Sequence, residues 1–344
     1  MKKKPFGLDI GATTIKLVWL DSGQGGYAFK ASVIAPTPAR GMLSEAPLDE
    51  EEMAQVIRKA AEDIGVDSKF VNVALAENQV YTKVLEMPVL SEKELRSAIY
   101  WEAEQYIPVP LTNITLAWNV LKKPETNSVN EKMQVLMVGA PTVLINKYQR
   151  IISGAGFTVI AMETEILSAV RSLVLGDNFP TSLIINIGSV STSLAIIRKG
   201  IMVLTYSMSI GGAAINRAIA ADLGLTAAQA EEYKKAYGFS DKNLGGKIGK
   251  ATEPILSSIL AEVKKSIAFY NQKYKDDATI RQIILSGGTA KLPGIDAFFA
   301  NASGIETEIA NPWKVLSSQK IPKEILDNGP DYAIAVGLAM RDYE

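Results

Sequence analysis

Residues 6–20 of the chain read FGLDIGATTIKLVWL, which is an apolar run, a short polar turn and a second apolar run. Aromatic, β-branched and other apolar residues dominate residues 6–10 and 15–20, and a glycine with two threonines separates the two runs. The pattern predicts two antiparallel strands joined by a tight turn at the start of the chain.

The turn of this hairpin carries groups that suit a phosphate. Gly11 leaves room for a ligand beside the backbone, and the two threonines offer hydroxyl and amide donors. Asp9 ends the first strand, where it would hold magnesium through the water ligands of that ion, and Lys16 adds positive charge. The predicted site comprises Asp9, Gly11, Ala12, Thr13, Thr14 and Lys16. An ordinary hairpin turn has the same pattern and is the alternative.

The pattern returns once. Residues 182–197 read SLIINIGSVSTSLAII, again two apolar runs around a turn that contains glycine and hydroxyl residues. A third β-like run follows each copy, at residues 27–34 and 201–207, so the chain is predicted to consist of two related halves. Asn186, Gly188 and Ser191 are the second set of phosphate candidates. Gly211 and Gly212 open a helix whose free N–H groups would face phosphate.

Composition narrows the function classes. The chain has 344 residues, a net charge of −1, and neither cysteine nor histidine. These absences exclude disulfides, cysteine nucleophiles, Ser-His-Asp triads and zinc sites built from those residues. No basic stripe points to a nucleic acid. Residues 2–10 lack a secretory h-region and no window approaches about 18 apolar residues, so we expect a cytoplasmic protein without a spanning helix.

Paired phosphate hairpins resemble those of the actin, Hsp70 and sugar-kinase superfamily. Residues 285–294, LSGGTAKLPG, are similar to the adenosine motif of actin-like ATPases, and residues 331–341 resemble the closing helix. The resemblance implies an α/β actin-like ATPase fold, with two related ribonuclease-H-like halves around a nucleotide cleft that takes ATP and Mg2+. It adds Gly287, Gly288, Thr289 and Lys291 to the predicted site. Residues 230–234, AEEYK, resemble the FtsA branch, in which Glu231 would accept from the ribose hydroxyls and Lys234 would lie near the base; a solvated helical pair is the alternative.

Two further stretches resemble the PilM family of type IV pilus assembly. They are residues 98–108, AIYWEAEQYIP, and residues 308–313, EIANPW. The resemblance implies an ATP-binding scaffold that binds the N-terminal cytoplasmic peptide of the inner-membrane protein PilN, is recruited by it to the inner face of the cytoplasmic membrane, and contacts the pilus motor complex. Self-association is an analogy at the level of the fold. A sugar-type small-molecule kinase and a cell-division FtsA-like filament protein are the alternatives.

The predicted division of the chain has four parts. Residues 1–86 form the first half with its phosphate hairpin, residues 87–160 form an inserted FtsA/PilM-type subdomain, residues 161–180 contain a bridging helix, and residues 181–344 form the second half. We expect residues 70–76 and 79–87 to pair as another hairpin, and residues 49–64 to form a helix capped by Asp49. Core positions are favoured for Trp101, Trp118 and Trp313.

One departure from the superfamily bears on catalysis. The superfamily usually has Asp in the second hairpin, whereas this chain has Asn186, which supplies no negative charge to hold magnesium or orient water. The candidate for positioning water is Glu165, with Glu163 next, although both acids also suit a helix N-terminus. The sequence therefore predicts ATP binding with slow or no hydrolysis.

Overall fold

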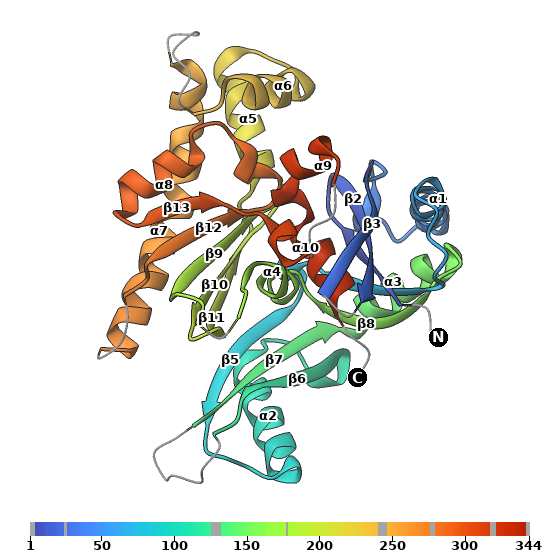
Figure 1. The fold of residues 1–344 in the computed structure, drawn as a ribbon, viewed down its shortest axis with the longest axis vertical. Helices are drawn as coiled ribbons and strands as arrows, with labels where there is room; N and C mark the ends of the chain where they lie inside the picture. The colour runs from blue at the N-terminus through green and yellow to red at the C-terminus, as the bar shows by residue number, and fades with distance from the viewer. Residues whose placement is uncertain are drawn as a thin grey trace.

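The computed structural model describes residues 4–23, 26–124, 132–176, 178–239, 246–275, 279–316 and 321–341. Its elements form two five-stranded sheets, a three-stranded sheet and the helices that cover them (Figure 1). In these stretches no helix is both long enough and apolar enough to cross a bilayer.

The first sheet has the strand order β3-β2-β1-β4-β8. Its strands are β1 (Phe6–Ile10), β2 (Thr14–Gly23), β3 (Gly26–Pro36), β4 (Phe70–Leu75) and β8 (Thr158–Thr164). The pairs β1–β2 and β2–β3 are antiparallel, which confirms the hairpin, whereas β1–β4 and β4–β8 are parallel. Helices α1 (Pro47–Asp63) and α3 (Thr142–Gly154) pack on this sheet through side chains such as Ile57 and Ile151.

The second sheet repeats this arrangement with the order β11-β10-β9-β12-β13. Its strands are β9 (Ser182–Ile187), β10 (Thr192–Arg198), β11 (Ile201–Met208), β12 (Gln282–Ser286) and β13 (Glu306–Ile309). Again the first three strands pair antiparallel and the last two join in parallel. In both sheets the register shifts within the outer antiparallel pair, at Trp19/Leu20 and at Ile196/Ile197. The two halves are therefore copies of one topology, as the repeated sequence pattern predicts.

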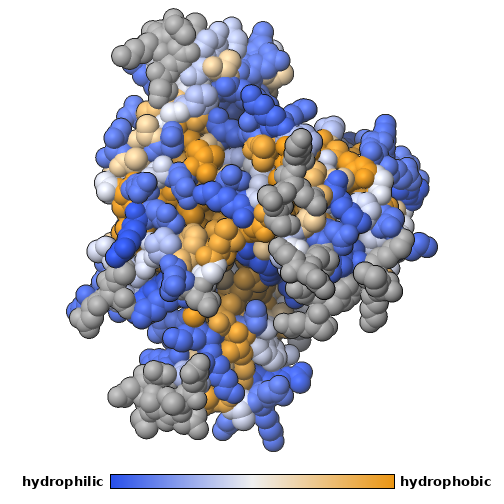
Figure 2. Space-filling view, in the orientation of Figure 1, coloured by the Kyte–Doolittle hydropathy of each residue, from blue (hydrophilic) through white to orange (hydrophobic). Residues whose placement is uncertain are grey.

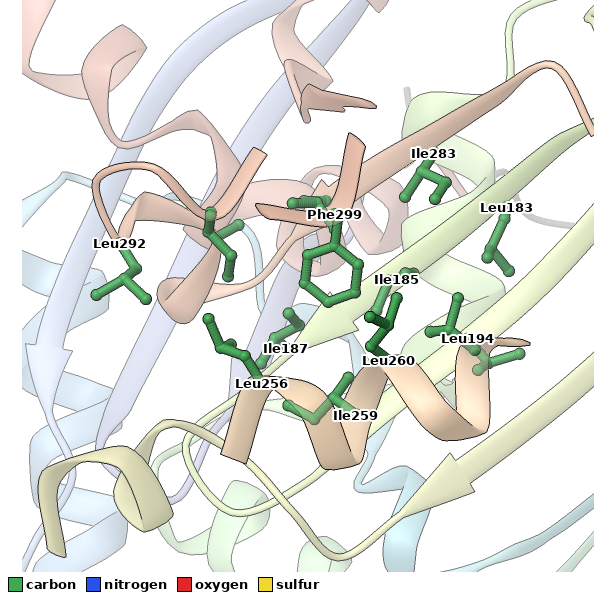
Figure 3. Packing of buried hydrophobic residues seen from close by; sticks show 14 of the residues in the cluster. Leu183, Ile185, Ile187, Leu194, Leu256, Ile259, Leu260, Ile283, Leu292 and Phe299 are labelled. Atoms are coloured by element: carbon green, nitrogen blue, oxygen red, sulfur yellow. The ribbon is translucent and has the colours of Figure 1, made fainter. Parts of the chain in front are cut away.

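Four helices accompany the second sheet. They are α5 (Gly212–Leu223), α6 (Ala227–Tyr237), α7 (Lys247–Lys273) and α8 (Ile295–Ser303). Figure 3 shows Leu256 and Ile259 of α7 and Phe299 of α8 gathered against Ile185 and Leu194 of the sheet, and all five side chains are fully buried. Apolar residues three or four apart on α7 thus supply the face that the sheet buries.

Two helices lie between the five-stranded sheets, namely α4 (Glu165–Leu173) and α10 (Gly329–Met340) (Figure 1). The bridging helix is shorter than residues 163–175, the range that the sequence predicts, because Glu163 and Thr164 belong to β8. The Thr164 side chain caps α4 by accepting from the N–H of Leu167. Ala169 of α4 and Leu338 of α10 share a buried cluster with Ile284 of β12. These two helices join the halves.

The third sheet has the order β5-β7-β6, with strands β5 (Tyr81–Met87), β6 (Ile114–Lys122) and β7 (Met133–Pro141). Helix α2 (Glu92–Tyr106) packs on it and begins with a Ser91–Glu94 capping box, which the sequence SEKE at residues 91–94 predicts. The expected hairpin of residues 70–87 is wrong, because β4 pairs with β1 and β8 while β5 pairs with β7. Val71 of β4 enters the buried cluster with α1 and α3, and Ala74 enters the cluster with α4, so both faces of β4 are covered inside the sheet.

The predicted divisions of the chain near residues 86 and 160 stay predictions. The pairings place β5 with β6 and β7, and α3 packs on the first sheet beside α1. On α2 the buried stripe is Leu95, Ile99 and Ala103. Trp101 lies off that stripe and is 61% exposed, so the expected core position is wrong for this tryptophan, whereas Trp313 is buried.

Helix α1 begins two residues earlier than expected. Its N-cap is Ala46, and Pro47, whose fixed φ suits the first helical position, starts the helix. Asp49 is therefore inside the first turn, where it accepts a hydrogen bond from the Ser44 hydroxyl. The remaining elements are the 3-10 turns η1 (Gly41–Leu43), η2 (Glu77–Gln79), η3 (Leu111–Asn113), η4 (Gly288–Lys291) and η5 (Pro312–Val315), and helix α9 (Lys323–Asp327). From their polar residues and glycines, residues 122–131 and 238–249 are expected to be loops. Residues 125–131 and 240–245 lie outside the described residues, and the second expectation is wrong for residues 247–249, which belong to α7.

Candidate functional site

A cavity of about 830 Å³ lies where the β1–β2 turn and the β9–β10 turn approach each other. Most of the predicted site residues line it: Asp9, Gly11, Ala12, Thr13, Thr14, Lys16, Glu165, Asn186, Gly188, Ser191, Gly212, Glu231, Lys234, Gly287, Gly288, Thr289 and Lys291. Gly211 lies just behind the described wall, where a Cβ would come within 2.6 Å of the Gly188 carbonyl oxygen. The roles assigned to these residues stay predictions, but the fold gathers them in one place.

The first turn is closed by a hydrogen bond from the N–H of Gly11 to the carbonyl oxygen of Thr14, at 3.0 Å. A Cβ at Gly11 would lie 2.8 Å from that oxygen, so only glycine fits. Asp9 is 2% exposed, and its Oδ2 accepts from the Lys16 ammonium at 3.0 Å. Burial alone would lower the pKa of Lys16, but the attraction and hydrogen bond of Asp9 outweigh burial and raise it. Lys16 therefore carries its full charge at the turn.

The second turn has the same closure. The N–H of Gly188 donates to the carbonyl oxygen of Ser191 at 2.9 Å. The carbonyl oxygen of Gly188 in turn accepts from the N–H of Gly212 at 2.9 Å and from the Thr289 hydroxyl at 3.3 Å, which ties the turn to α5 and η4. Asn186 is 5% exposed, and its Oδ1 has no hydrogen-bond partner among the described residues. A buried amide oxygen without a partner at a cavity wall is an acceptor that a ligand or its hydration water would satisfy.

The turn that follows β12 forms another part of the wall. Gly287 has φ +83°, and a Cβ there would lie 2.5 Å from the carbonyl oxygen of Ile187, so the backbone of this turn packs directly against β9. Lys291 pairs with Asp331 of α10, and its ammonium donates to Asn328 Oδ1 at 2.6 Å. The turn thus connects the second sheet to the helix between the halves.

Glu231 and Lys234 form an ion pair on α6, with 2.7 Å between Oε2 and Nζ. Burial acts to raise the pKa of Glu231, but hydrogen bonds and charge from Lys234, Asn216 and Lys235 outweigh it and lower the pKa to about 2. Burial lowers the pKa of Lys234, and the carboxylate of Glu231 only partly offsets that effect. Since Lys234 is 8% exposed and lines the cavity, this pair differs from a solvated helical pair.

Glu165 is the first residue of α4 at the cavity wall, and two hydrogen bonds connect the start of this helix to Glu77 of η2. The N–H of Glu77 donates to Glu165 Oε2 at 3.2 Å, and the N–H of Ile166 donates to Glu77 Oε2 at 3.3 Å. Burial, with the charge of Asp9 second, raises the pKa of Glu165, and burial raises the pKa of Glu77 to about 7. The second candidate, Glu163, lies away from the described cavity wall, where Arg171 and Arg341 pair with it.

Several lining residues escape a reading of the sequence. They include Arg40, Gln79, Tyr148, Asn216, Lys235 and Asp331. Tyr148 reaches the wall from α3, a helix that the sequence assigns to an inserted subdomain, so tertiary packing alone places it there. Asn216 could have been found from the sequence, because it lies on the helix that Gly212 opens. In the structure its amide nitrogen donates to Glu231.

The residues that line the cavity suit a bound nucleotide better than a metal ion whose ligands are all protein side chains. Both turns place backbone N–H groups beside glycines, and a Cβ would lie 2.8 Å from the Thr14 carbonyl oxygen at Gly11 and 3.2 Å from that of Ser191 at Gly188. The described part of the chain contains no group of three or more Asp, Glu, His or Cys residues arranged to hold a metal. Asp9 is the carboxylate beside the first turn, and Lys16 already pairs with it. A magnesium ion would therefore take most of its ligands from phosphates and water.

Comparison with known proteins supplies the family. A sequence model of the type IV pilus assembly protein PilM matches residues 7–343. The chain is similar to the PilM-PilN type IV pilus biogenesis complex, with 26% identity, a TM-score of 0.85, and coverage of 99% of this chain and 98% of that chain.

More distant structures share the fold. One is ethanolamine utilization protein EutJ from Carboxydothermus hydrogenoformans, at 16% identity and TM-score 0.57, with 98% of this chain and 89% of that chain covered. Another is MreB 5 of Spiroplasma citri bound to AMPPNP, at 15% identity and TM-score 0.51, with 98% of this chain and 95% of that chain covered. The predicted actin-like ATPase fold is confirmed. Since the family match spans nearly the whole chain, the chain belongs to the family of the type IV pilus assembly protein PilM.

Proposed function

We propose that this actin-like pilus-assembly protein binds ATP in the cavity between its halves and, in that state, holds the N-terminal cytoplasmic peptide of PilN. The observation that carries the nucleotide part is the duplicated turn. Gly11 and Gly188 each close a turn by the same amide-to-carbonyl bond, at 3.0 and 2.9 Å, and both turns line one cavity. In this proposal the remaining N–H groups of the two turns bind the phosphate oxygens, because those of Gly11 and Gly188 already donate within their turns.

The remaining walls suit the other parts of ATP. The Glu231–Lys234 pair, of which only the lysine is buried, offers a carboxylate for ribose hydroxyls, and the glycines at residues 287 and 288 leave room for a base beside the backbone. Asp9 would hold magnesium through water, and that ion, when bound, neutralises phosphate charge. The solved MreB 5 structure, which holds AMPPNP in the same fold, supports this assignment.

Support for the PilN partner comes from the PilM-PilN complex, to which this chain is similar over nearly its full length. Hydrophobic residues gather at the surface over the third sheet, in the lower part of Figure 2. Several exposed large side chains belong to α2 and to the segments that follow it: Tyr100, Trp101, Tyr106, Val109 and Val120. A peptide partner would use such apolar surface. In this proposal the protein is cytoplasmic and reaches the inner face of the membrane, and the motor complex, through PilN.

The test is a titration of the purified protein with a synthetic N-terminal PilN peptide, with MgATP present and then absent. We expect saturable binding of ATP and of the peptide, and a peptide affinity that depends on the nucleotide, because both ligands engage the first half. A peptide from elsewhere in PilN serves as the control. Failure of the peptide to bind in either state would remove the scaffold assignment, and ATP consumption that appears only with a small-molecule acceptor would support the kinase alternative.

Asn186 should keep ATP turnover slow, below about 1 per second, an ordinary enzyme rate. The variant Asn186→Asp places a carboxylate where the amide oxygen has no partner among the described residues. We expect magnesium to lower the dissociation constant for ATP about tenfold more in this variant than in the wild type. The control Asn146→Asp makes the same change on an exposed position of α3. Isothermal titration at several magnesium concentrations checks the prediction, and an unchanged magnesium dependence in Asn186→Asp would contradict it.

A further inference from the structure

The chain between β3 and α1 contributes a wall of the cavity that no nucleotide motif predicts. Residues 39–43 line the cavity on the side of the first sheet. From the sequence, this segment is only a turn-rich surface stretch rich in proline. Contacts at both ends give the segment a fixed position, and Arg40 is the cation that it brings to the cavity.

One end of the segment is bonded directly to the first phosphate turn. The N–H of Thr37 donates to the carbonyl oxygen of Thr13 at 3.0 Å, and the Thr37 hydroxyl donates to the carbonyl oxygen of Gly11 at 2.8 Å. Any displacement of the turn therefore carries the start of the segment with it. The segment belongs to the half that contains the first turn, whereas the Glu231–Lys234 pair belongs to the other half.

The other end is held by a buried ammonium. Lys147 of α3 is 2% exposed, and its Nζ donates to the carbonyl oxygens of Met42 and Ser44 and to the carboxylate of Glu45. Burying a lysine costs free energy unless its donors are satisfied, and here three acceptors, all from residues 42–45, satisfy it. Lys147 is thus a positioning residue that fixes the far end of the segment.

Arg40 lies between these two anchors. Of the lysine and arginine side chains that line the cavity among the described residues, it has the most distant carboxylate partner. Lys16, Lys234 and Lys235 each have a carboxylate oxygen within 3.2 Å, and Lys291 has one closer still. Arg40 Nη1 is 3.5 Å from Asp49 Oδ2, and its side chain is 74% exposed. An exposed pair at this distance is weak, so the guanidinium can exchange Asp49 for a phosphate at little cost.

We propose that Arg40 contacts the terminal phosphate of the bound nucleotide and makes the site prefer a nucleoside triphosphate over a diphosphate. This inference rests on the proposed binding of ATP. The planar guanidinium forms two parallel hydrogen bonds to phosphate oxygens, and the charge it supplies matches the additional charge of the third phosphate. Asp49 competes with the nucleotide for Arg40, so the two partners set the strength of the preference.

The test measures dissociation constants for ATP and for ADP by isothermal titration on the full chain. Arg40→Gln is expected to weaken ATP binding about tenfold, the scale of one charge-assisted contact, and to leave ADP binding within about twofold. Asp49→Asn is expected to shift affinity in the opposite sense, strengthening ATP binding a few fold because it releases the guanidinium. Arg96→Gln on the exposed face of α2 removes the same charge far from these contacts and should change neither constant.

Lys147→Met provides an independent readout. It removes the anchor without touching Arg40, so it should reduce the ATP-to-ADP preference, and adding Arg40→Gln to it should reduce the preference little further. Equal losses for ATP and ADP in Arg40→Gln, or no loss for either, would overturn the inference while leaving ATP binding itself intact. Absence of both nucleotides from the wild-type chain would instead overturn the proposed function.

Discussion

Replacing Gly337 by alanine is expected to lower the free energy of unfolding by about 3 kcal/mol, the upper part of the range for overpacked sites. A Cβ at this position would lie 1.8 Å from the carbonyl oxygen of Ser168 and 2.6 Å from its carbon. The obstacle is the backbone of α4, which cannot turn aside as a flexible side chain can. The two helices would have to separate.

The clash falls where the halves of the molecule are joined. Near it, Arg171 of α4 donates to the carbonyl oxygen of Gly337 at 2.9 Å, and the Ser172 hydroxyl donates to that of Ala333 at 2.7 Å. Separation of α4 and α10 would break both bonds and open the buried cluster that contains Ala169 and Leu338. Intrinsic helix propensity works in the other direction, since alanine in a helix is favoured over glycine by about 1 kcal/mol.

Urea denaturation followed by circular dichroism measures this loss. Gly154→Ala is the matched control, because it adds a methyl group to α3 at a position where the nearest atom, the Ala54 Cβ, would be 3.3 Å away. We expect the control to change the free energy of unfolding by less than about 1 kcal/mol. A Gly337→Ala chain as stable as the wild type would mean that α4 and α10 do not cross this closely.

The parts of the fold that the sequence predicts are those coded locally. The two hairpins, the capping boxes at Ser91 and Thr226 and the third strand of each half follow from runs of apolar residues, turn formers and cap residues near one another in the chain. Because the hairpin pattern occurs twice, two related halves could also be predicted, and the resemblance to actin-like ATPases implies the cleft between them. Most of the glycine and threonine positions of the candidate site then follow from where the turns lie.

What the sequence does not reveal depends on contacts between distant segments. The strand at residues 70–75 has an apolar run nearby in the chain that could form a hairpin with it, yet it pairs in parallel with β1 and β8, which are distant in sequence. Arg40 and Tyr148 reach the cavity from a surface loop and from a helix, and neither position carries a motif. Glu163 and Glu165 are two residues apart, but only the second lines the cavity, because the strand-to-helix boundary falls between them.

Glu77 is expected to make stability fall as pH rises through about 7. Its side chain is 2% exposed, and burial raises its pKa from 4.5 to about 7, although the N–H of Ile166 and the Thr82 and Thr164 hydroxyls favour the charged form. The folded chain then holds a proton that the unfolded chain releases at lower pH. This stabilisation is complete below about pH 4.5 and is lost as pH rises through about 7, and the shift corresponds to about 3 kcal/mol.

The variant Glu77→Gln should remove that dependence. Glutamine keeps an oxygen for the N–H of Ile166 and never ionises, so the variant should match the wild type at pH 4 and exceed it in free energy of unfolding by about 3 kcal/mol at pH 8.5. Subtracting the urea midpoint of the wild type from that of the variant at each pH removes the contribution of all groups that titrate alike in both chains.

Two groups near Glu77 need a control of their own. Glu165 is cross-linked to Glu77 and also has a raised pKa, while Tyr106 of α2 faces the same carboxylate and titrates at higher pH. Glu165→Gln should flatten part of the same slope, whereas Tyr106→Phe should leave the slope between pH 5 and 8 unchanged. Parallel curves for wild type and Glu77→Gln would show that Glu77 is already ionised in the folded chain at pH 5. Its carboxylate would then be stabilised by the N-terminus of α4 more than it is destabilised by burial, and the link between η2 and the bridging helix would be a charge–dipole contact that does not depend on a proton.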